Sequence, residues 1–142
     1  MSNPDRPIVL AVDDTPENLD IVNGILGIDY DVKVAVNGHI ALKIAQSLSP
    51  DLILLDIMMP EMDGYEVCRR LKADPDTQGI PVIFLTAKGE TADEAEGFGL
   101  GAADYILKPD NPPLLKARVN SHLALKHNME ELQAAYAGIN RQ

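Results

Sequence analysis

The sequence predicts an α/β fold in which five parallel strands form a single sheet with helices on both of its faces. Five short apolar runs alternate along the chain with segments whose apolar residues recur at helical spacing. Such alternation favours parallel strands joined by right-handed helical crossovers. The run at 52–55 lacks polar residues, as expected for a strand covered on both faces. The 142 residues suffice for one domain with a short appendage.

The expected strands are the apolar runs at 8–12, 30–36, 52–55, 81–85 and 104–107. The first helix has Thr15 as N-cap and Pro16 at its first position, and its predicted apolar face comprises Leu19, Ile21, Val22, Ile25 and Leu26. The second helix is predicted from the spacing of Ile40, Ala41, Ile44, Ala45 and Leu48. Three further helices are expected at 65–73, at 91–98, and from about Asn111 through Pro112 to 142.

Composition excludes several classes of function. A formal net charge of −10 argues against direct nucleic-acid binding, which needs a basic surface. No apolar stretch reaches the roughly 18 residues of a membrane span. Residues 1–7 are polar and contain proline, so we expect a flexible leader rather than a signal peptide and a cytoplasmic protein. The single cysteine, Cys68, excludes an internal disulfide and a CxxC metal site.

Polar residues follow four of the predicted strands at the point where each apolar run stops. Asp13 and Asp14 follow the first strand, Asp56 the third, Thr86 the fourth and Lys108 the fifth. The carboxyl ends of parallel strands meet in one crevice, so these side chains are expected to lie together. Three carboxylates repel one another, and a hard divalent cation with oxygen ligands such as Mg²⁺ would relieve that repulsion. A cation and a hydroxyl beside a metal suit a phosphoryl group.

Each of these residues also has an ordinary structural explanation. The two aspartates after the first strand could cap the following helix, and Asp56 could close a turn. Lys108 could be a surface cation held extended by Pro109, and Thr86 a plain strand residue. None of these explanations accounts for the gathering of three carboxylates at one edge of the sheet.

Five separated motifs resemble the receiver domain of two-component response regulators, and they occur in order at matching strand ends. The motifs are Asp13-Asp14, the segment 54–64, the segment 85–87, the segment 101–105 and Lys108-Pro109. The resemblance covers about 8–125, which we take as the receiver domain. It implies the flavodoxin-like strand order 2-1-3-4-5 of the chemotaxis regulators.

The resemblance also implies a role for each residue of the acidic crevice. Asp56 would accept a phosphoryl group from the phosphohistidine of a histidine kinase or a phosphotransfer protein. Asp14 and Asp56 would ligate Mg²⁺ directly, Asp13 would act mainly through water, and the backbone carbonyl of Met58 would complete the protein ligands.

The remaining roles implied by the resemblance concern the phosphoryl group and the switch. Lys108 would bind phosphoryl oxygens, with Thr86, Ala87 and Met58 also at the phosphoryl site. Thr86 would turn inward toward the phosphorylated aspartate, and Tyr105 would follow as an aromatic switch. Tyr105 could instead be a half-buried strand aromatic without a switching role.

Turnover of external substrates is not expected, and we predict a self-phosphorylating domain with slow autodephosphorylation. An aspartate-nucleophile phosphatase usually carries a second acid two residues after the nucleophile, where this chain has Met58. Met58, Lys88 and Asp110 vary within or depart from the family pattern, which leaves the dephosphorylation rate and the local packing open. A docking module without phosphorylation is disfavoured by the intact acids. Gly97, Gly99 and Gly101 precede a strand and so do not form a dinucleotide fingerprint.

The chain continues beyond the receiver pattern as a predicted helical extension over 126–142. An a/d seam runs through His122, Leu125, Met129, Leu132, Tyr136 and Ile139. The seam favours a dimerising coiled coil or a signalling helix, while packing on its own receiver or fraying are the alternatives. The segment 111–126 is similar to receivers that precede cyclic-dinucleotide output domains. A downstream output domain is therefore a candidate partner, and a stand-alone receiver is the alternative.

Overall fold

The computed structural model describes residues 6–86, 99–107 and 112–140, without the side chains of 86, 107 and 137–140. Five strands form one parallel sheet in the order β2-β1-β3-β4-β5, which confirms the predicted fold class and strand order. The strands are β1 Ile8–Val12, β2 Asp31–Ala35, β3 Leu52–Asp56, β4 Val82–Thr86 and β5 Asp104–Leu107. The central strand β3 is buried throughout, so the sheet places Asp56 at the middle of its carboxyl edge.

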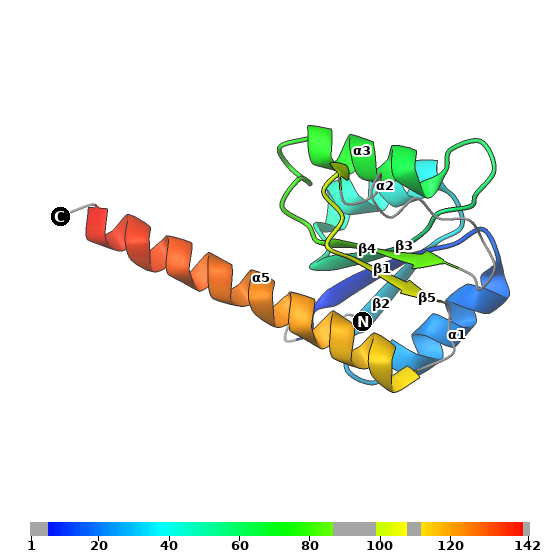
Figure 1. Cartoon of the computed structure of the whole chain (residues 1–142), viewed down its shortest axis with the longest axis horizontal. Helices are drawn as coiled ribbons and strands as arrows, with labels where there is room; N and C mark the ends of the chain where they lie inside the picture. Colours follow the sequence, from blue (N-terminus) through cyan, green and yellow to red (C-terminus); the bar gives the residue numbers. More distant parts are fainter. Residues whose placement is uncertain (1–5, 87–98, 108–111, 141–142) are drawn as a thin grey trace.

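Helices cover both faces of this sheet (Figure 1). On one face lie α2, Gly38–Leu48, and α3, Gly64–Ala73, over a core that includes Phe84 and Leu55. On the other lie α1, Pro16–Leu26, and α5, Pro112–Asn140, over a second core that includes Leu54 and Ile83. Alternate residues of β3 and β4 therefore serve the two cores, as the pleat of a strand requires. The helix predicted at 91–98 lies outside the described residues.

Short polar side chains begin the helices. The side chains of Asn37 and Asp63 accept hydrogen bonds from the backbone N–H groups three residues on, at 2.9 Å each, and so cap α2 and α3. Thr15 is the N-cap of α1, as predicted, but its side chain makes no capping hydrogen bond. The carboxylate of Asp13 accepts the Thr15 backbone N–H instead, at 2.9 Å.

Most sequence-derived boundaries agree with the structure to within one residue, and the helix faces need one correction. The strand predicted at 81–85 is observed one residue later, and β3 extends to include Asp56. Ile21 belongs to the predicted apolar face of α1, and Ile40 and Leu48 to the helical spacing that predicts α2, but all three are exposed. They lie at the margins of their apolar stripes, and the periodicity of a stripe does not give its width.

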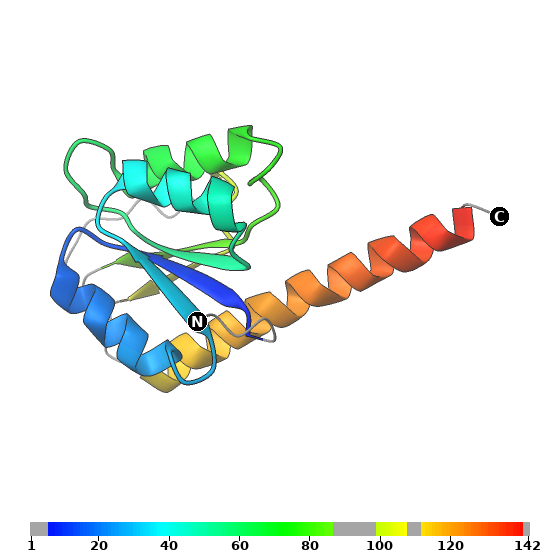
Figure 2. The same cartoon turned by 180° about the vertical axis from the view of Figure 1, so that it is seen from behind.

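The last helix, α5, leaves the body of the protein (Figures 1 and 2). Its first part packs on the sheet through Leu115 and Val119, which are buried. Beyond the body its apolar side chains are exposed, and these are Leu125, Met129, Leu132 and Tyr136. Four positions of the predicted a/d seam therefore face solvent in a single copy of the chain, while the side chain of Ile139 is not described.

The strand β2 forms one edge of the sheet and carries opposite charges on it. The Lys33 ammonium lies 3.4 Å from the Asp31 carboxylate, and the next residue along the strand, Val34, is exposed.

The helices within the described parts of the chain include none with the length and apolar character needed to span a membrane.

Candidate functional site

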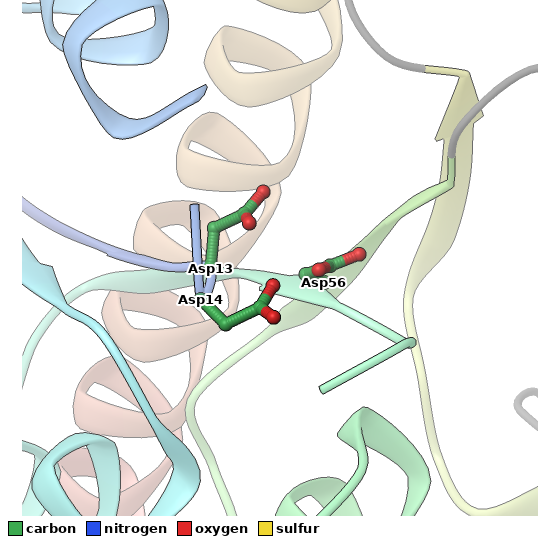
Figure 3. A group of neighbouring side chains, drawn as sticks. All are labelled: Asp13, Asp14 and Asp56. Carbon is green, nitrogen blue, oxygen red and sulfur yellow. The ribbon is translucent and has the colours of Figure 1, made fainter. Parts of the chain in front are cut away.

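Three carboxylates gather at the carboxyl ends of two adjacent strands (Figure 3). Asp13 and Asp14 follow β1, and Asp56 ends β3, which pairs with β1 in parallel register. One carboxylate oxygen from each lies within 4.8 Å of the other two. The structure thus brings together the three acids that the sequence places at strand ends. Asp13 and Asp56 are buried, at 4% and 3% exposure, whereas Asp14 is exposed and opens the cluster to solvent.

Hydrogen bonds from the start of α1 orient Asp13. One carboxylate oxygen accepts the Thr15 N–H, and the other accepts the Asn18 side-chain amide at 3.2 Å. The Asp13 backbone N–H donates to the Ala35 carbonyl of β2 at 3.1 Å. The carboxylate is therefore fixed by a helix, while its main chain is fixed by the sheet.

The donor set of this cluster fits a hard divalent cation. It consists of carboxylate oxygens alone, and three negative charges this close repel one another unless a cation balances them. Mg²⁺ prefers oxygen ligands and keeps several waters, so a cluster with one exposed member suits it. The three acids that the sequence placed at strand ends therefore form a donor set that suits Mg²⁺.

A tight segment between β3 and α3 holds the backbone that follows Asp56. A Cβ atom on Gly64 would lie 2.3 Å from the Asp56 carbonyl oxygen, closer than any side chain can approach. The Gly64 N–H donates to the Ile57 carbonyl at 2.8 Å. The side chain of Met62, within the same segment, is buried. Met58, two residues after Asp56, is 58% exposed, so its apolar side chain lies at the surface.

Several predicted site residues are described only in their backbone or lie outside the described ranges altogether. The backbone of Thr86 ends β4 and pairs with Leu107, but its side chain is not described. Ala87, Lys88, Lys108, Pro109 and Asp110 lie outside the described residues. The roles that the resemblance implies for them at the phosphoryl group stay predictions.

Tyr105 lies half-buried on β5, where it pairs with Phe84 of β4. Its hydroxyl donates to the hydroxyl of Tyr65 on α3 at 3.3 Å. Sequence reasoning identified Tyr105 but not Tyr65, because the two tyrosines are 40 positions apart and no local pattern connects them.

An ion-pair cluster joins β5 to α5, and sequence reasoning missed it. Arg118 Nη1 lies 2.6 Å, and His122 Nε2 3.1 Å, from the same Asp104 carboxylate oxygen. The other Asp104 oxygen accepts the Tyr105 N–H at 2.8 Å. Burial alone raises the pKa of Asp104, but the hydrogen bonds from Arg118, His122 and Tyr105 outweigh it and hold the pKa below its ordinary value. The first residue of the predicted seam is thus bound to its own domain.

Comparison with protein families matches residues 9–120 to the response regulator receiver domain. A protein of Vibrio cholerae named "Probable cyclic di-GMP phosphodiesterase" is 48% identical over 124 residues, covering 87% of this chain and 28% of that protein. The response regulator PleD of Caulobacter vibrioides is 42% identical over 126 residues, covering 88% of this chain and 28% of PleD. This chain thus spans well under half the length of these two relatives.

Solved structures agree with this match. The signal receiver domain of a signal transduction histidine kinase from Syntrophus aciditrophicus has a TM-score of 0.75 at 37% identity, over 83% of this chain and 90% of that one. The chemotaxis protein CheY4 of Vibrio cholerae has a TM-score of 0.75 at 32% identity, over 82% of this chain and 98% of that one. With its sheet order and its acidic cluster, this chain belongs to the response regulator receiver domain family.

Proposed function

We propose that this receiver is activated when Asp56 accepts a phosphoryl group from a phosphohistidine of a histidine kinase or phosphotransfer protein. An Asp56 oxygen would bond to phosphorus as the phosphorus–nitrogen bond of the donor breaks, and the donor imidazole would keep the electron pair of that bond. The observation that carries this proposal is the set of three carboxylate oxygens within 4.8 Å of one another. Phosphoryl transfer depends mostly on positioning and charge neutralisation, which such a cluster can provide.

In this proposal the acids of the crevice hold Mg²⁺, and Lys108 holds the phosphoryl group. Asp13, Asp14, Asp56 and the Met58 carbonyl would hold Mg²⁺, which when bound neutralises negative charge on the carboxylates and on the phosphoryl oxygens. Lys108 would hold phosphoryl oxygens through its positive charge. Thr86 and Ala87 would supply a hydroxyl and backbone contacts to the same group. The hydrogen bonds that fix Asp13 support this division, because one acid is oriented before any ligand arrives.

Phosphorylation would act as a switch rather than as one step of a turnover cycle. The acyl phosphate adds charge and acceptor oxygens, which would draw Thr86 inward and let Tyr105 follow. Met58 carries no acid that could protonate the leaving group of a phosphate ester. Its exposed apolar side chain, two residues after Asp56, supports slow autodephosphorylation instead of turnover.

The helical extension over 126–142 would carry the conformational change of the receiver to a second copy of the chain or to an output domain. We propose a leader over 1–7, the receiver over 8–125 and a helical extension over 126–142, acting in the cytoplasm. The exposed apolar side chains of α5 support pairing of two extensions, because they form one stripe. One relative is named as a cyclic di-GMP phosphodiesterase, which supports an output domain of cyclic-dinucleotide chemistry downstream of this receiver.

Intact-mass measurement after incubation with acetyl phosphate and Mg²⁺ tests the phosphorylation site. The wild-type chain should gain the mass of one phosphoryl group, and Asp56→Asn should gain none. Asp20→Asn, in an exposed aspartate of α1, is the matched control and should be labelled like the wild type. Equal labelling of Asp56→Asn and the wild type would show that another residue accepts the group.

A further inference from the structure

Three aromatic side chains form a row from α3 across β4 to the edge strand β5. Phe84, at the centre of the row, is fully buried. Its ring centroid lies 5.3 Å from that of Tyr65 in an edge-on arrangement and 5.1 Å from that of Tyr105 in a tilted one. The tyrosine hydroxyls meet above it at 3.3 Å. Tyr105 is thus held from two directions, by ring packing on Phe84 and by the hydroxyl of Tyr65.

The Tyr65 end of the row is tied to the acidic cluster through the backbone. Tyr65 directly follows Gly64, whose Cα packs against the Asp56 carbonyl and whose N–H bonds Ile57. Asp63 caps the same turn of α3 by accepting the Glu66 N–H. Tyr65 therefore has little freedom relative to Asp56, whereas Tyr105 sits on the outermost strand of the sheet.

We propose that Tyr65 is a positioning residue that holds Tyr105 against Phe84 and thereby favours the phosphorylated state of the receiver. The inference rests on the proposed function, in which Tyr105 turns inward when Asp56 carries a phosphoryl group. In this structure the Tyr105 ring already packs inward against the core around Phe84, and the Tyr65 hydroxyl favours that arrangement. Coupling between two sites is reciprocal, so a contact that favours inward Tyr105 raises the affinity for the phosphoryl group by the same factor. Tyr65 would then set how far the switch is biased before any signal arrives.

The size of the effect follows from the geometry of the hydroxyl pair. Hydroxyl pairs usually lie about 2.7–2.8 Å apart, so a 3.3 Å contact is a weak hydrogen bond. Loss of a weak hydrogen bond changes an equilibrium by about twofold to fivefold. Substitution by phenylalanine removes only the hydroxyl and keeps the ring that packs on Phe84.

The test is the affinity of the full chain for beryllium fluoride with Mg²⁺, a non-covalent analogue of an acyl phosphate, measured by titration calorimetry. Tyr65→Phe should weaken binding by about twofold to fivefold. Tyr105→Phe should weaken binding by a similar factor. The double variant should bind about as tightly as either single variant, because both substitutions remove the same hydrogen bond. Tyr136→Phe, in an exposed tyrosine of α5, should bind like the wild type.

Four results would overturn the inference, and they point to different faults. Wild-type affinity in Tyr65→Phe, or effects that multiply in the double variant, would remove the positioning role and leave the proposed function standing. A loss of unfolding free energy in urea with an unchanged dissociation constant would make Tyr65 merely structural. Absence of beryllium fluoride binding and of acetyl phosphate labelling in the wild type would remove the proposed function, and this inference with it.

Discussion

Gly64 shows how one residue without a side chain can shape the site. Because a Cβ atom would lie 2.3 Å from the Asp56 carbonyl oxygen, Gly64→Ala must displace either α3 or the end of β3. We expect a loss of about 1–3 kcal/mol in the free energy of unfolding, as in other overpacked sites. Phosphoryl uptake should fall as well, since the displaced atoms include the main chain of Asp56. Urea denaturation and intact mass after acetyl phosphate treatment measure the two effects.

Gly24 supplies the control for that substitution. It is an exposed residue of α1, and a Cβ atom there would meet nothing within 4 Å. Gly24→Ala should raise the free energy of unfolding by about 0.5–1 kcal/mol, because alanine loses less backbone entropy in a helix. If both alanine variants behave alike, the close packing at Gly64 does not limit the structure.

Asp14 gives a prediction about charge. Its carboxylate is the exposed member of a cluster of three acids, so Asp14→Ala removes repulsion in the absence of metal. The melting temperature without metal should stay unchanged or rise, and the increase that Mg²⁺ gives the wild type should shrink. Thermal melts with Mg²⁺ and with a chelator measure both. A large loss of metal-free stability would show that Asp14 holds the fold, and Asp20→Ala controls for loss of a surface charge.

At the level of single residues, the sequence correctly predicted that the acids at the strand ends lie together. Asp13, Asp14 and Asp56 could be placed together because parallel strands present their carboxyl ends at one edge. Tyr65 and the Asp104 ion pair could not, because these contacts join distant parts of the chain through side-chain geometry alone. The periodicity of a sequence does not predict which side chain of a helix will contact a given strand.

At the scale of elements, the Asp104 cluster anchors α5 to β5 and should make that anchor sensitive to pH. The pKa of Asp104 is lowered in the folded chain, so its contribution to stability is complete above the ordinary aspartate pKa and is lost as the pH falls through the lowered value. Asp104→Asn should cost about 0.5–1 kcal/mol near neutral pH, since Arg118 is partly exposed. The difference from the wild type should shrink below about pH 4.

Urea denaturation at several pH values checks this prediction. Glu131→Gln is the matched control, because Glu131 pairs with His127 on α5 where both side chains are 68% exposed. That substitution should change stability little at any pH, as expected for an exposed pair. A constant difference between Asp104→Asn and the wild type from neutral to acidic pH would contradict the anchoring role of the ionised carboxylate.

The elements themselves were largely predictable, and the errors have physical causes. Apolar runs and helical spacing identified the strands and the helices α1, α2, α3 and α5 because each element buries a stripe that its period reveals. Ile21 was misplaced because periodicity gives the centre of a stripe but not its width. The capping roles of Asn37 and Asp63 follow from local chemistry and could have been predicted from their positions before α2 and α3.

At the scale of the whole molecule, the tail should control association. Leu132 is 71% exposed on the apolar stripe of α5, so Leu132→Lys should shift a weak dimer toward monomer. Ala134→Lys, an exposed position away from the seam, should leave the mass in light scattering unchanged. A chain ending at Leu125 should behave like the Leu132 variant. Equal masses for the wild type and both altered chains would argue against the seam.

The charged edge of the sheet has a consequence for behaviour at high concentration. A strand at the edge of a sheet has unpaired backbone N–H and C=O groups, which can form hydrogen bonds with an extended peptide. On β2 an incoming peptide would have to strip water from the Lys33 ammonium, which lies beside the Asp31 carboxylate, before it could bond. This border of the protein should therefore resist fibrous polymerisation even when many copies crowd together.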